Sequence, residues 1–359
     1  MVKLLIVYNK VWSYREKIFD LINQQFDLTV AFTDPQFIDK KFSFKTIYIP
    51  GKWKGPVYVH DSPLHPLCAQ YDAVLAYGEI RSVSIMKLGF ISGRKYSLSY
   101  WGIGVSASYA NRFDENKKWD FIRYFLSRRA ESLVFYSDYP VEKYVKAGFK
   151  REQLFVAHNT TNVSDKLDLN VKRDSFLFVG TLYKQKGFEI LLEAYAALKK
   201  RSEVEMPVLN IIGEGPERQF IEQWIAENQM EDQVFLHGAI YDTEILRSFY
   251  EKAIACVSPN QAGLSVLTTM GYATTFVTEK NAITGGEIFN IKDRYNGIIY
   301  EGGAAALEEK LHWIIHNKQK VIDMGMRAKE HYDQNRTPQQ MADALMDAVR
   351  YALKVKNNE

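Results

Sequence analysis

The sequence contains only two cysteines among its 359 residues, Cys68 and Cys256, one in each half. Two distant cysteines exclude a disulfide framework and are typical of the reducing cytoplasm, where we place the protein. Long hydrophobic runs are also missing, because no stretch approaches the roughly 18 consecutive apolar residues of a membrane-spanning helix. The opening run LLIVYN (4–9) is too short for a secretory signal and predicts a buried strand. We therefore expect neither a secreted disulfide scaffold nor an integral membrane protein.

Patterns of metal ligands and of nucleic-acid binding are missing as well. There is no Asp-x-Asp motif, and the seven histidines are scattered rather than clustered with cysteines. The 46 lysines and arginines are spread along the chain without an accompanying nucleic-acid motif. We expect no metal ion, no other cofactor and no nucleic-acid partner.

The net charge of +3 is unevenly distributed. Residues 1–165 hold 23 Lys and Arg against 16 Asp and Glu, a net charge of +7, whereas the rest holds 23 against 27, a net charge of −4. This asymmetry has two interpretations: the first half faces an anionic partner, or the difference is chance.

Short apolar runs alternate with helical patterns in the first half, which is typical of βαβ units. A helix is predicted over 13–25, where Ile18, Leu21 and Ile22 have helical spacing. Strands are predicted at 4–9, 27–32, 46–50, 73–78, 95–102, 132–137 and 154–159.

The same alternation of strands and helices begins again after a polar, aperiodic stretch (160–174), which we interpret as the linker. Strands are predicted at 175–180, 207–213, 233–238, 253–259 and 273–279, and helices at 187–200, 216–228, 242–252 and 264–271. A last helix over 337–355 follows Thr337-Pro338 and has apolar residues at four-residue spacing, namely Met341, Leu345, Val349 and Leu353.

The predicted fold is therefore α/β, with two Rossmann-like domains and a ligand site expected in a cleft between them. The first domain comprises 1–165 with the returning helix 338–359, and the second comprises 166–337.

The segment FLFVGTLYKQKGFEILLEAY (176–195) is the first candidate binding motif. A strand ends at Gly180, and Lys186-Gly187 opens a helix. Helix N-terminal amides attract a phosphate, and Lys186 adds a full positive charge. The alternative is an ordinary strand–turn–helix with a surface lysine.

Two further strand–turn–helix segments follow. At 210–225 a strand leads into Gly213-x-Gly215-Pro216, a pattern that by itself predicts only a turn. In the segment 257–300, Gly263-Leu264-Ser265 opens a helix whose free amides suit a diphosphate, and Gly285-Gly286-Glu287 starts a short helix or turn where Glu287 is placed to grip sugar hydroxyls.

In order and spacing, the block 176–303 resembles the C-terminal domain of family-four glycosyltransferases with the GT-B fold, which are retaining enzymes that use nucleotide sugars. The first half resembles the family more loosely. The resemblance implies a donor bound mainly by the second domain, an acceptor bound mainly by the first, a terminal helix that packs back on the first domain, and no metal in catalysis.

Carried over by position, the resemblance places the donor diphosphate at Lys186 and at the loop Gly263, Leu264 and Ser265. The segment His237–Ile240, with Gly238 and Ile240, corresponds to the stretch beside the nucleobase. Glu287 corresponds to the acidic residue of a Gly-rich turn near the donor. Glu287 and Lys186 are thus the expected catalytic residues, and Gly180 and Gly213 are expected at the donor site.

The sequence also departs from the family pattern. Thr181 stands where the family has an arginine, and Lys184 is the candidate to replace that charge. The family's Glu-x7-Glu pair falls on Asn260, which still suits a sugar hydroxyl, and on Thr268, which is short for a ribose contact. These departures leave the ribose and sugar contacts open.

On the acceptor side, Arg15 resembles a residue of the first helix that faces the acceptor. The stretch YWGIG (100–104), with Trp101 and Gly102, resembles a Trp-Gly-His-Gly motif in which Ile103 replaces the histidine. Glu79 follows a strand end and is a candidate acceptor-side carboxylate, but such a glutamate is often a helix cap or the ion-pair partner of a residue such as Arg81.

The segment KKWDFIRYFLSRRAESLVF (117–135) predicts a basic helix. It places Trp119, Ile122, Phe125 and Leu126 on one face, with charge from Lys117, Lys118, Arg123, Arg128 and Arg129. Such a helix suits an anionic membrane surface, which would make the protein peripheral on the inner face of the membrane. The alternative is a helix that packs on the core and solvates its basic face.

The predicted function is transfer of a hexose, with retention, from a UDP- or GDP-linked sugar to a glycan or lipid-linked acceptor in surface polysaccharide biosynthesis. Two alternatives stay open: a non-catalytic relative that binds nucleotide sugars, and a GT-B-type nucleotide-sugar epimerase.

Overall fold

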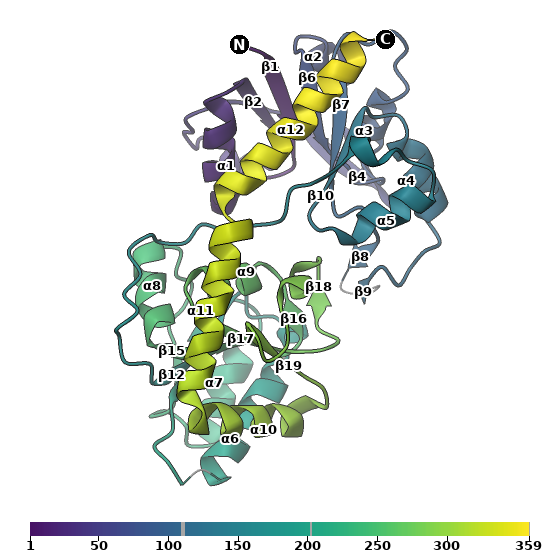
Figure 1. The fold of residues 1–359 in the computed structure, drawn as a ribbon. Helices are drawn as coiled ribbons and strands as arrows, with labels where there is room; N and C mark the ends of the chain where they lie inside the picture. Colours follow the sequence, from purple (N-terminus) through teal and green to yellow (C-terminus); the bar gives the residue numbers. More distant parts are fainter. Residues whose placement is uncertain (109–111, 202, 359) are drawn as a thin grey trace. The chain divides into compact units, whose positions relative to one another are not determined.

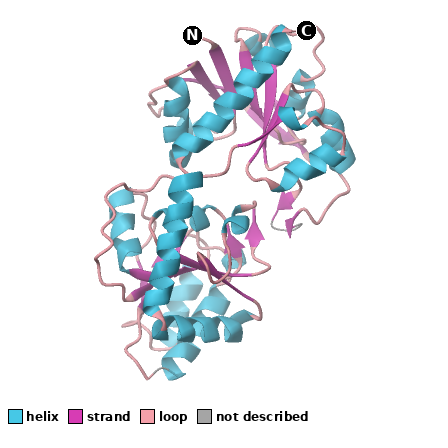
Figure 2. Cartoon of the chain, in the orientation of Figure 1, coloured by secondary structure: helices cyan, strands magenta, loops and turns pink. Residues whose placement is uncertain are grey.

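Two parallel β-sheets organise the chain in a computed structural model that describes residues 1–108, 112–201 and 203–358 (Figures 1 and 2). The described residues divide into two units. The first lies within Met1–Ala107, Asn111–Thr160 and Thr337–Glu359, and the second lies within Thr161–Arg336 together with Ser108.

The main sheet of the first unit has the strand order β11-β10-β7-β6-β1-β2-β3, and neighbouring strands run parallel. Its strands are β1 (Lys3–Val7), β2 (Asp27–Phe32), β3 (Lys45–Tyr48), β6 (Ala73–Tyr77), β7 (Ser97–Gly102), β10 (Ser132–Phe135) and β11 (Leu154–Val156). The helices are α1 (Ser13–Asn23), α2 (His65–Cys68), α3 (Val83–Leu88), α4 (Asp120–Ser127), α5 (Tyr139–Lys146) and α12 (Pro338–Asn357). Two short pairs lie outside this sheet: the antiparallel hairpin β4 (Gly51–Lys54) and β5 (Val57–His60), and β8 (Ala107–Ser108) with β9 (Arg112–Phe113).

The main sheet of the second unit has the order β14-β13-β12-β15-β17-β19, again with parallel neighbours. Its strands are β12 (Ser175–Val179), β13 (Val208–Ile212), β14 (Val234–Leu236), β15 (Ala253–Val257), β17 (Thr275–Glu279) and β19 (Gly297–Tyr300). The helices are α6 (Phe188–Arg201), α7 (Arg218–Glu227), α8 (Thr243–Lys252), α9 (Leu264–Gly271), α10 (Gly303–His316) and α11 (Lys318–Asn335). A small parallel pair joins β16 (Gln261–Ala262) to β18 (Ile283–Thr284). The predicted α/β class with two Rossmann-like domains is confirmed.

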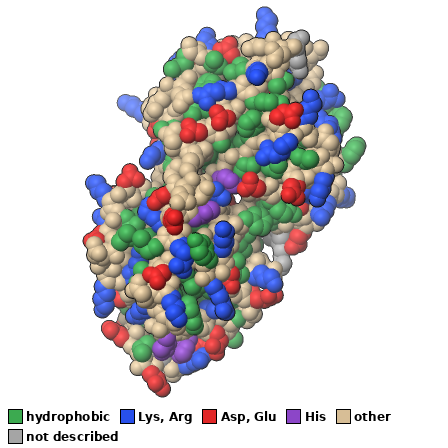
Figure 3. Space-filling model, viewed as in Figure 1, with side chains coloured by type: hydrophobic (Ala, Val, Ile, Leu, Met, Phe, Trp, Pro, Cys, Tyr) green, Lys and Arg blue, Asp and Glu red, His purple; other side chains and the backbone are tan. Residues whose placement is uncertain are grey.

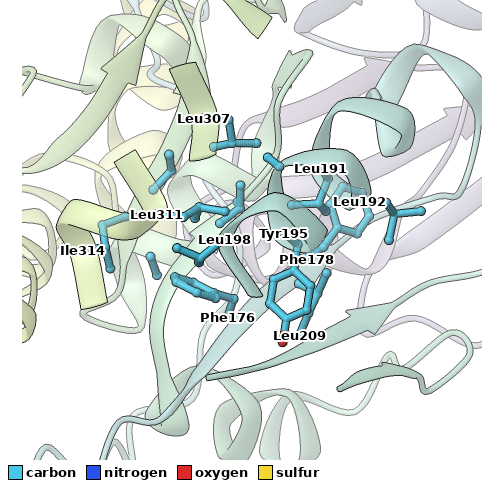
Figure 4. Packing of buried hydrophobic residues seen from close by; sticks show 14 of the residues in the cluster. Phe176, Phe178, Leu191, Leu192, Tyr195, Leu198, Leu209, Leu307, Leu311 and Ile314 are labelled. Atoms are coloured by element: carbon cyan, nitrogen blue, oxygen red, sulfur yellow. The ribbon is translucent and has the colours of Figure 1, made fainter. Parts of the chain in front are cut away.

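The central strands are buried along almost their whole length, as expected when helices cover both faces of a parallel sheet. In the second unit, Phe176 and Phe178 of β12 pack with the apolar faces of α6 and α10 (Figure 4). The helix residues in this cluster are Leu191, Leu192, Tyr195, Leu198, Leu307, Leu311 and Ile314.

Helix α12 completes the core of the first unit although it comes last in the sequence. It begins at a capping box, in which Thr337 Oγ1 accepts from the Gln340 N–H and Gln340 Oε1 accepts from the Thr337 N–H. Its buried face carries Met341, Leu345 and Val349, three of the residues predicted at four-residue spacing.

Three segments differ from the sequence-based expectation. The hairpin β4–β5 follows the third strand, in a stretch between 50 and 73 where no strand was predicted. The basic helix predicted over 117–135 is limited to α4, because the chain turns after it and 132–135 join the sheet as β10. The polar stretch 160–174 is not a solvated linker throughout, since Thr161 and Arg173 are buried and Arg173 Nη1 donates to the carbonyl of Ala253 at 2.9 Å.

Among the described residues, no helix combines the length and the apolar character needed to cross a membrane.

Candidate functional site

Lys186 lies in a short 3₁₀ turn (Lys184–Lys186) between the carboxyl end of β12 and helix α6. The side chain turns back toward the strand, because its Nζ lies 3.2 Å from the position that a Cβ on Gly180 would occupy. Only 7% of the residue is exposed, and its ammonium lies 5.4 Å from the ring centre of Tyr183 and 6.0 Å from that of Phe178. Within the described part of the chain, no carboxylate forms an ion pair with it. The surface lysine of the alternative interpretation is therefore not what the structure contains.

Burial disfavours the charged form of a lysine, and it lowers the pKa of Lys186 from 10.5 to about 8. Near pH 7 the side chain is still mostly an ammonium ion. A buried ammonium without a carboxylate partner is stabilised by any anion that reaches it, because Coulomb attraction is stronger where water is scarce.

The loop after β15 lies directly against Lys186. The Asn260 N–H donates to the carbonyl of Lys186 at 3.4 Å, and a Cβ on Gly187 would lie 2.8 Å from the Asn260 side chain. Gly187 also has a φ of +76°, so glycine is required there both for the backbone conformation and for space. The Tyr183 hydroxyl adds a hydrogen bond to Gln261 Oε1 at 3.2 Å. The two loops thus form one surface.

The pair β16–β18 brings two helix N-termini to the same place. Because these strands are parallel, with Ala262 opposite Thr284, the segments that follow them leave at the same end. After β16 comes α9, with Gly263 as its N-cap and with Leu264 and Ser265 partly exposed in its first turn. The first N–H groups of a helix have no acceptor within it, so this turn presents donors to an anion.

After β18 comes the second N-terminus, a 3₁₀ turn over Glu287–Asn290. Glu287 is 8% exposed, and its Oε2 accepts from the Gly285 N–H at 2.9 Å and from the Thr284 hydroxyl at 3.4 Å. These bonds hold the carboxylate in a defined orientation at the start of the turn.

The ends of β12, β13 and β14 meet at three glycines. The Gly180 N–H donates to the carbonyl of Ile212 at 3.0 Å, and the Gly213 N–H donates to the carbonyl of Gly238 at 2.7 Å. A Cβ on Gly213 would lie only 1.9 Å from the Gly180 carbonyl oxygen, so the backbones approach closely. Beyond Gly238, Ile240 packs against a buried cluster of the second unit.

Three further polar candidates of this unit occupy different environments. Thr181 and Lys184 are exposed beside the Lys186 turn. Thr268 Oγ1 lies 3.2 Å from the Leu264 carbonyl and 3.1 Å from the Thr161 hydroxyl, and it bonds to both. The Thr268 hydroxyl therefore links α9 to the segment that enters the unit, and a ribose contact of Thr268 stays a prediction.

In the first unit, two expected acceptor-side residues are enclosed. Trp101 is 0% exposed and stacks on Tyr8 with ring centres 5.1 Å apart. Arg15 is 2% exposed, donates to Asn159 Oδ1 at 2.8 Å and lies over the Trp101 ring. Gly102, at the end of β7, is buried as well. Direct contact of these residues with an acceptor would require the packing around them to open, so their acceptor-side role stays a prediction.

Glu79 and Arg81 form the ion pair that was the alternative interpretation of Glu79. Arg81 Nε donates to Glu79 Oε1 at 3.1 Å, and Nη2 donates to Oε2 at 3.3 Å. The Arg81 guanidinium lies 5.3 Å from the ring centre of Trp53 in the hairpin.

Glu79 also lines a cavity of about 350 Å³, with residues that follow β1, β2 and β6 and residues of the hairpin β4–β5. Sequence reasoning assigned no role to the hairpin residues Trp53, Tyr58 and His60. A signal was present, since GKWKGPVYVH has two short alternating runs around Gly55-Pro56.

Comparisons with known proteins agree with this architecture. HepE from Anabaena, solved with UDP, aligns over 97% of this chain and 99% of its own, with a TM-score of 0.73 and 14% identity. A glycosyltransferase from Rickettsia africae aligns over 98% and 99%, with a TM-score of 0.72 and 14% identity. The lipopolysaccharide outer core galactosyltransferase WaaB aligns over 97% and 99%, with a TM-score of 0.66 and 15% identity. These likenesses define the class of fold as GT-B.

The second unit has a closer assignment. Residues 159–331, which include most of this unit, match the family model of glycosyl transferases group 1. A comparison with curated proteins gives no match.

We expect Gly213→Ala to lower the free energy of unfolding by about 1–3 kcal/mol or more, because the new methyl group collides with the Gly180 carbonyl. Gly263→Ala is the control, since a Cβ there meets only Gln261 Nε2 at 4.0 Å. Chemical denaturation of both variants measures the difference. Equal stability of the two would contradict the close approach of the strand ends.

Proposed function

We propose that the protein is a retaining glycosyltransferase that moves a hexose from a nucleoside-diphosphate sugar to a hydroxyl of a glycan or lipid-linked acceptor. The observation that carries the proposal is the buried ammonium of Lys186, which has no carboxylate partner among the described residues. Its turn contacts the Asn260 loop that leads to α9, whose first N–H groups also suit a diphosphate. Its position in a domain that matches glycosyl transferases group 1 supports the same conclusion.

UDP is the preferred nucleotide of the proposal, with GDP as the other option, because HepE has been solved with UDP, with UDP and glucose, and with UDP-glucose. In the reaction the bond between C1 of the sugar and the diphosphate oxygen breaks, and the acceptor oxygen bonds to C1 on the same face. The nucleoside diphosphate leaves with the electron pair, and the proton of the acceptor passes to a phosphate oxygen. Lys186 and the first amides of α9 stabilise the charge that develops on the leaving group, without a metal ion.

The remaining candidates take places around this group. Asn260 and Glu287 contact hydroxyls of the donor sugar, and Gly238 and Ile240 lie beside the base. The resemblance of the fold to WaaB, a galactosyltransferase of lipopolysaccharide, favours an acceptor of the cell surface and a role in polysaccharide biosynthesis.

We expect the affinity for UDP to fall as the pH rises from 7 to 9. Burial lowers the pKa of Lys186 to about 8, so the free protein loses its ammonium in this range, and the loss approaches about tenfold per pH unit above the pKa. Calorimetric titration with UDP at several pH values measures the slope. Lys186→Arg keeps its charge and should remove the slope, whereas a slope in Lys186→Ala equal to that of the wild type would contradict this role.

Glu287→Ala should reduce turnover by at least about 100-fold with little change in thermal stability, because it removes a contact of the donor sugar that matters most in the transition state. The measurement is release of nucleoside diphosphate from a panel of UDP- and GDP-hexoses. Glu301→Ala is the matched control, since Glu301 is an exposed carboxylate paired with Lys280 in the same unit. Wild-type turnover by Glu287→Ala would refute the role.

The same panel separates the alternatives for the wild type. Binding of a nucleotide sugar with no turnover of any donor would favour a non-catalytic relative. Release of an isomerised or free sugar with no need for an acceptor would favour an epimerase.

A second observation concerns the surface around α4, which we propose docks on an anionic membrane from the cytoplasmic side. Aromatic and aliphatic side chains are exposed there, namely Phe90, Trp119, Phe121, Ile122 and Phe125. Arg129 lies 4.8 Å from the ring centre of Phe90 and 5.4 Å from that of Phe125, and Lys117, Lys118 and Arg128 are exposed nearby. On the viewed face of the first unit, hydrophobic and basic side chains are neighbours (Figure 3). Exposed apolar side chains surrounded by basic ones suit docking on an anionic membrane.

Two residues of the sequence-based prediction do not belong to this face. Arg123 is 8% exposed and pairs with Asp120, and Leu126 packs against a buried cluster. The exposed face therefore centres on Phe121, Ile122 and Phe125.

We expect the protein to co-sediment with vesicles that contain phosphatidylglycerol and not with pure phosphatidylcholine, and to lose this binding at high salt. Phe121→Ser should weaken binding because the side chain is 80% exposed and would enter the interface. Tyr241→Ser, which changes an 86% exposed aromatic residue of the second unit, should bind as the wild type does. Equal binding of both variants would rule out this face.

A further inference from the structure

A polar pocket of about 230 Å³ lies in the second unit, between the turn that enters β19 and the C-terminal half of α11. The turn directly precedes β19, whereas Lys186 follows β12, and both strands belong to one parallel sheet. The turn and Lys186 therefore lie at opposite ends of the strands. The residues of the lining that matter here are Lys292, Tyr295, Asn296, Arg327, Glu330 and His331.

Hydrogen bonds fix the turn and join it to α11. Asn296 is buried, its Oδ1 accepts from the Lys292 N–H at 2.7 Å, and its Nδ2 donates to the Asn290 carbonyl at 3.0 Å. Asn290 Oδ1 accepts from Arg336 Nε at 2.6 Å and lies 3.2 Å from His331 Nε2. The shape of the pocket is therefore set by the fold and not by loosely placed side chains.

Two cations lie beside one aromatic ring of this pocket. The Arg327 guanidinium lies 5.0 Å and the Lys292 ammonium 5.9 Å from the ring centre of Tyr295. Arg327 Nε donates to the Tyr295 carbonyl at 2.6 Å, which fixes the plane of the guanidinium. Among the residues that the structure describes, no carboxylate forms an ion pair with Lys292 or Arg327. The two Nη groups of Arg327 thus remain as donors for a ligand.

The carboxylates near these cations have other partners. Asp293 Oδ1 accepts from the Ile299 N–H at 2.8 Å, and Asp333 pairs with Lys329. Glu330 belongs to the lining, and its Oε1 accepts from Gln334 Nε2 at 3.1 Å. One negative charge in the lining therefore faces two positive charges.

His331 is sensitive to this positive environment. Burial lowers its pKa most, and the positive charges of Arg336 and Lys292 lower it further, to about 4. The imidazole is therefore neutral near pH 7, and it does not add to the charge of the lining. The two cations of the lining outweigh its one carboxylate, so the pocket favours an anion.

The size and the geometry of the donors indicate which anion fits. A volume of about 230 Å³ lies below the roughly 300–1,000 Å³ of sites for larger ligands such as a nucleotide sugar. A guanidinium with two free Nη groups matches two oxygens of a phosphate, and an ammonium beside it adds a point charge.

We propose that this pocket binds a phosphate group, with two of its oxygens on the Nη groups of Arg327 and its charge also neutralised by Lys292. Free phosphate and a phosphate monoester share this chemistry. The Tyr295 ring is 50% exposed beside the cations, and the organic part of a monoester packs on it. The site is separate from the Lys186 site and does not depend on the proposed function.

The experiment titrates inorganic phosphate into the Lys186→Met variant by calorimetry near pH 7, with sodium chloride keeping the ionic strength constant. Lys186→Met removes the charge of the other anion site and retains the volume of the side chain. We expect saturable binding with a Kd of about 1 mM or tighter. Absence of saturable binding would overturn the proposal, whatever the donor assays show.

Variants in the same background locate the phosphate. Arg327→Ala should weaken binding about tenfold, and Arg327→Lys, which retains the charge without the fork, about threefold. Lys292→Ala should weaken it about threefold or more. Lys329→Gln is the control, because Lys329 lies on the same helix outside the lining and pairs with Asp333. Affinity in Arg327→Ala equal to that of the control would refute the site.

Glu330→Gln gives a test that loss of folding cannot imitate. It removes the carboxylate from the lining, so phosphate should bind about threefold tighter. Unchanged or weaker binding by this variant would contradict the electrostatic argument.

A titration with glycerol 3-phosphate distinguishes the two sources of the phosphate group. Tighter binding than that of inorganic phosphate, lost in Tyr295→Ala, would identify a phosphate monoester as the ligand. Equal or weaker binding would identify the free ion. Both results support a phosphate site in this pocket, since both require Arg327.

Discussion

The parallel arrangement of the strands in both main sheets is the constraint on which the functional surfaces depend. Parallel strands end at one edge of their sheet, so segments far apart in the sequence meet there. In the second unit this edge joins the turn of Lys186 to the loop of Asn260. In the first unit it joins the residues after β1, β2 and β6 around the cavity. The short strands β16 and β18 are also parallel, so the start of α9 and the turn of Glu287 follow them at the same end.

The two units differ in how they treat charge. In the second unit the Lys186 ammonium is buried without a carboxylate partner among the described residues. Its burial lowers the pKa of this side chain. The first unit pairs the charged groups of its cavity, as Lys10 with Asp34 and Glu79 with Arg81 show. The same sheet architecture therefore has two different charge environments at its carboxyl edges, and these are set by the side chains that follow the strands.

The repeated βα pattern of the sequence was sufficient to predict the fold class, because buried parallel strands have near-continuous apolar runs. Lys186 and Gly263–Ser265 could be predicted as candidates because a charged or glycine residue between strand and helix is a local signal. Whether Lys186 is buried depends on its contact with Gly180, which lies outside any periodic pattern. The burial of Trp101 could not be predicted for a similar reason: a residue near a strand end gives no local signal that Tyr8 and α12 enclose it. The two-residue strands β16 and β18 are too short to show any period.

The position of α12 in the core of the first unit has a consequence for how the protein is made. Met341, Leu345 and Val349 share one buried cluster with Leu4, Ile6 and Ile18 from the start of the chain. During translation the ribosome releases the first strands long before this helix exists, whereas Thr161–Arg336 is complete earlier and is free to fold as a unit. An apolar face of the N-terminal sheet therefore stays uncovered until α12 has been synthesised.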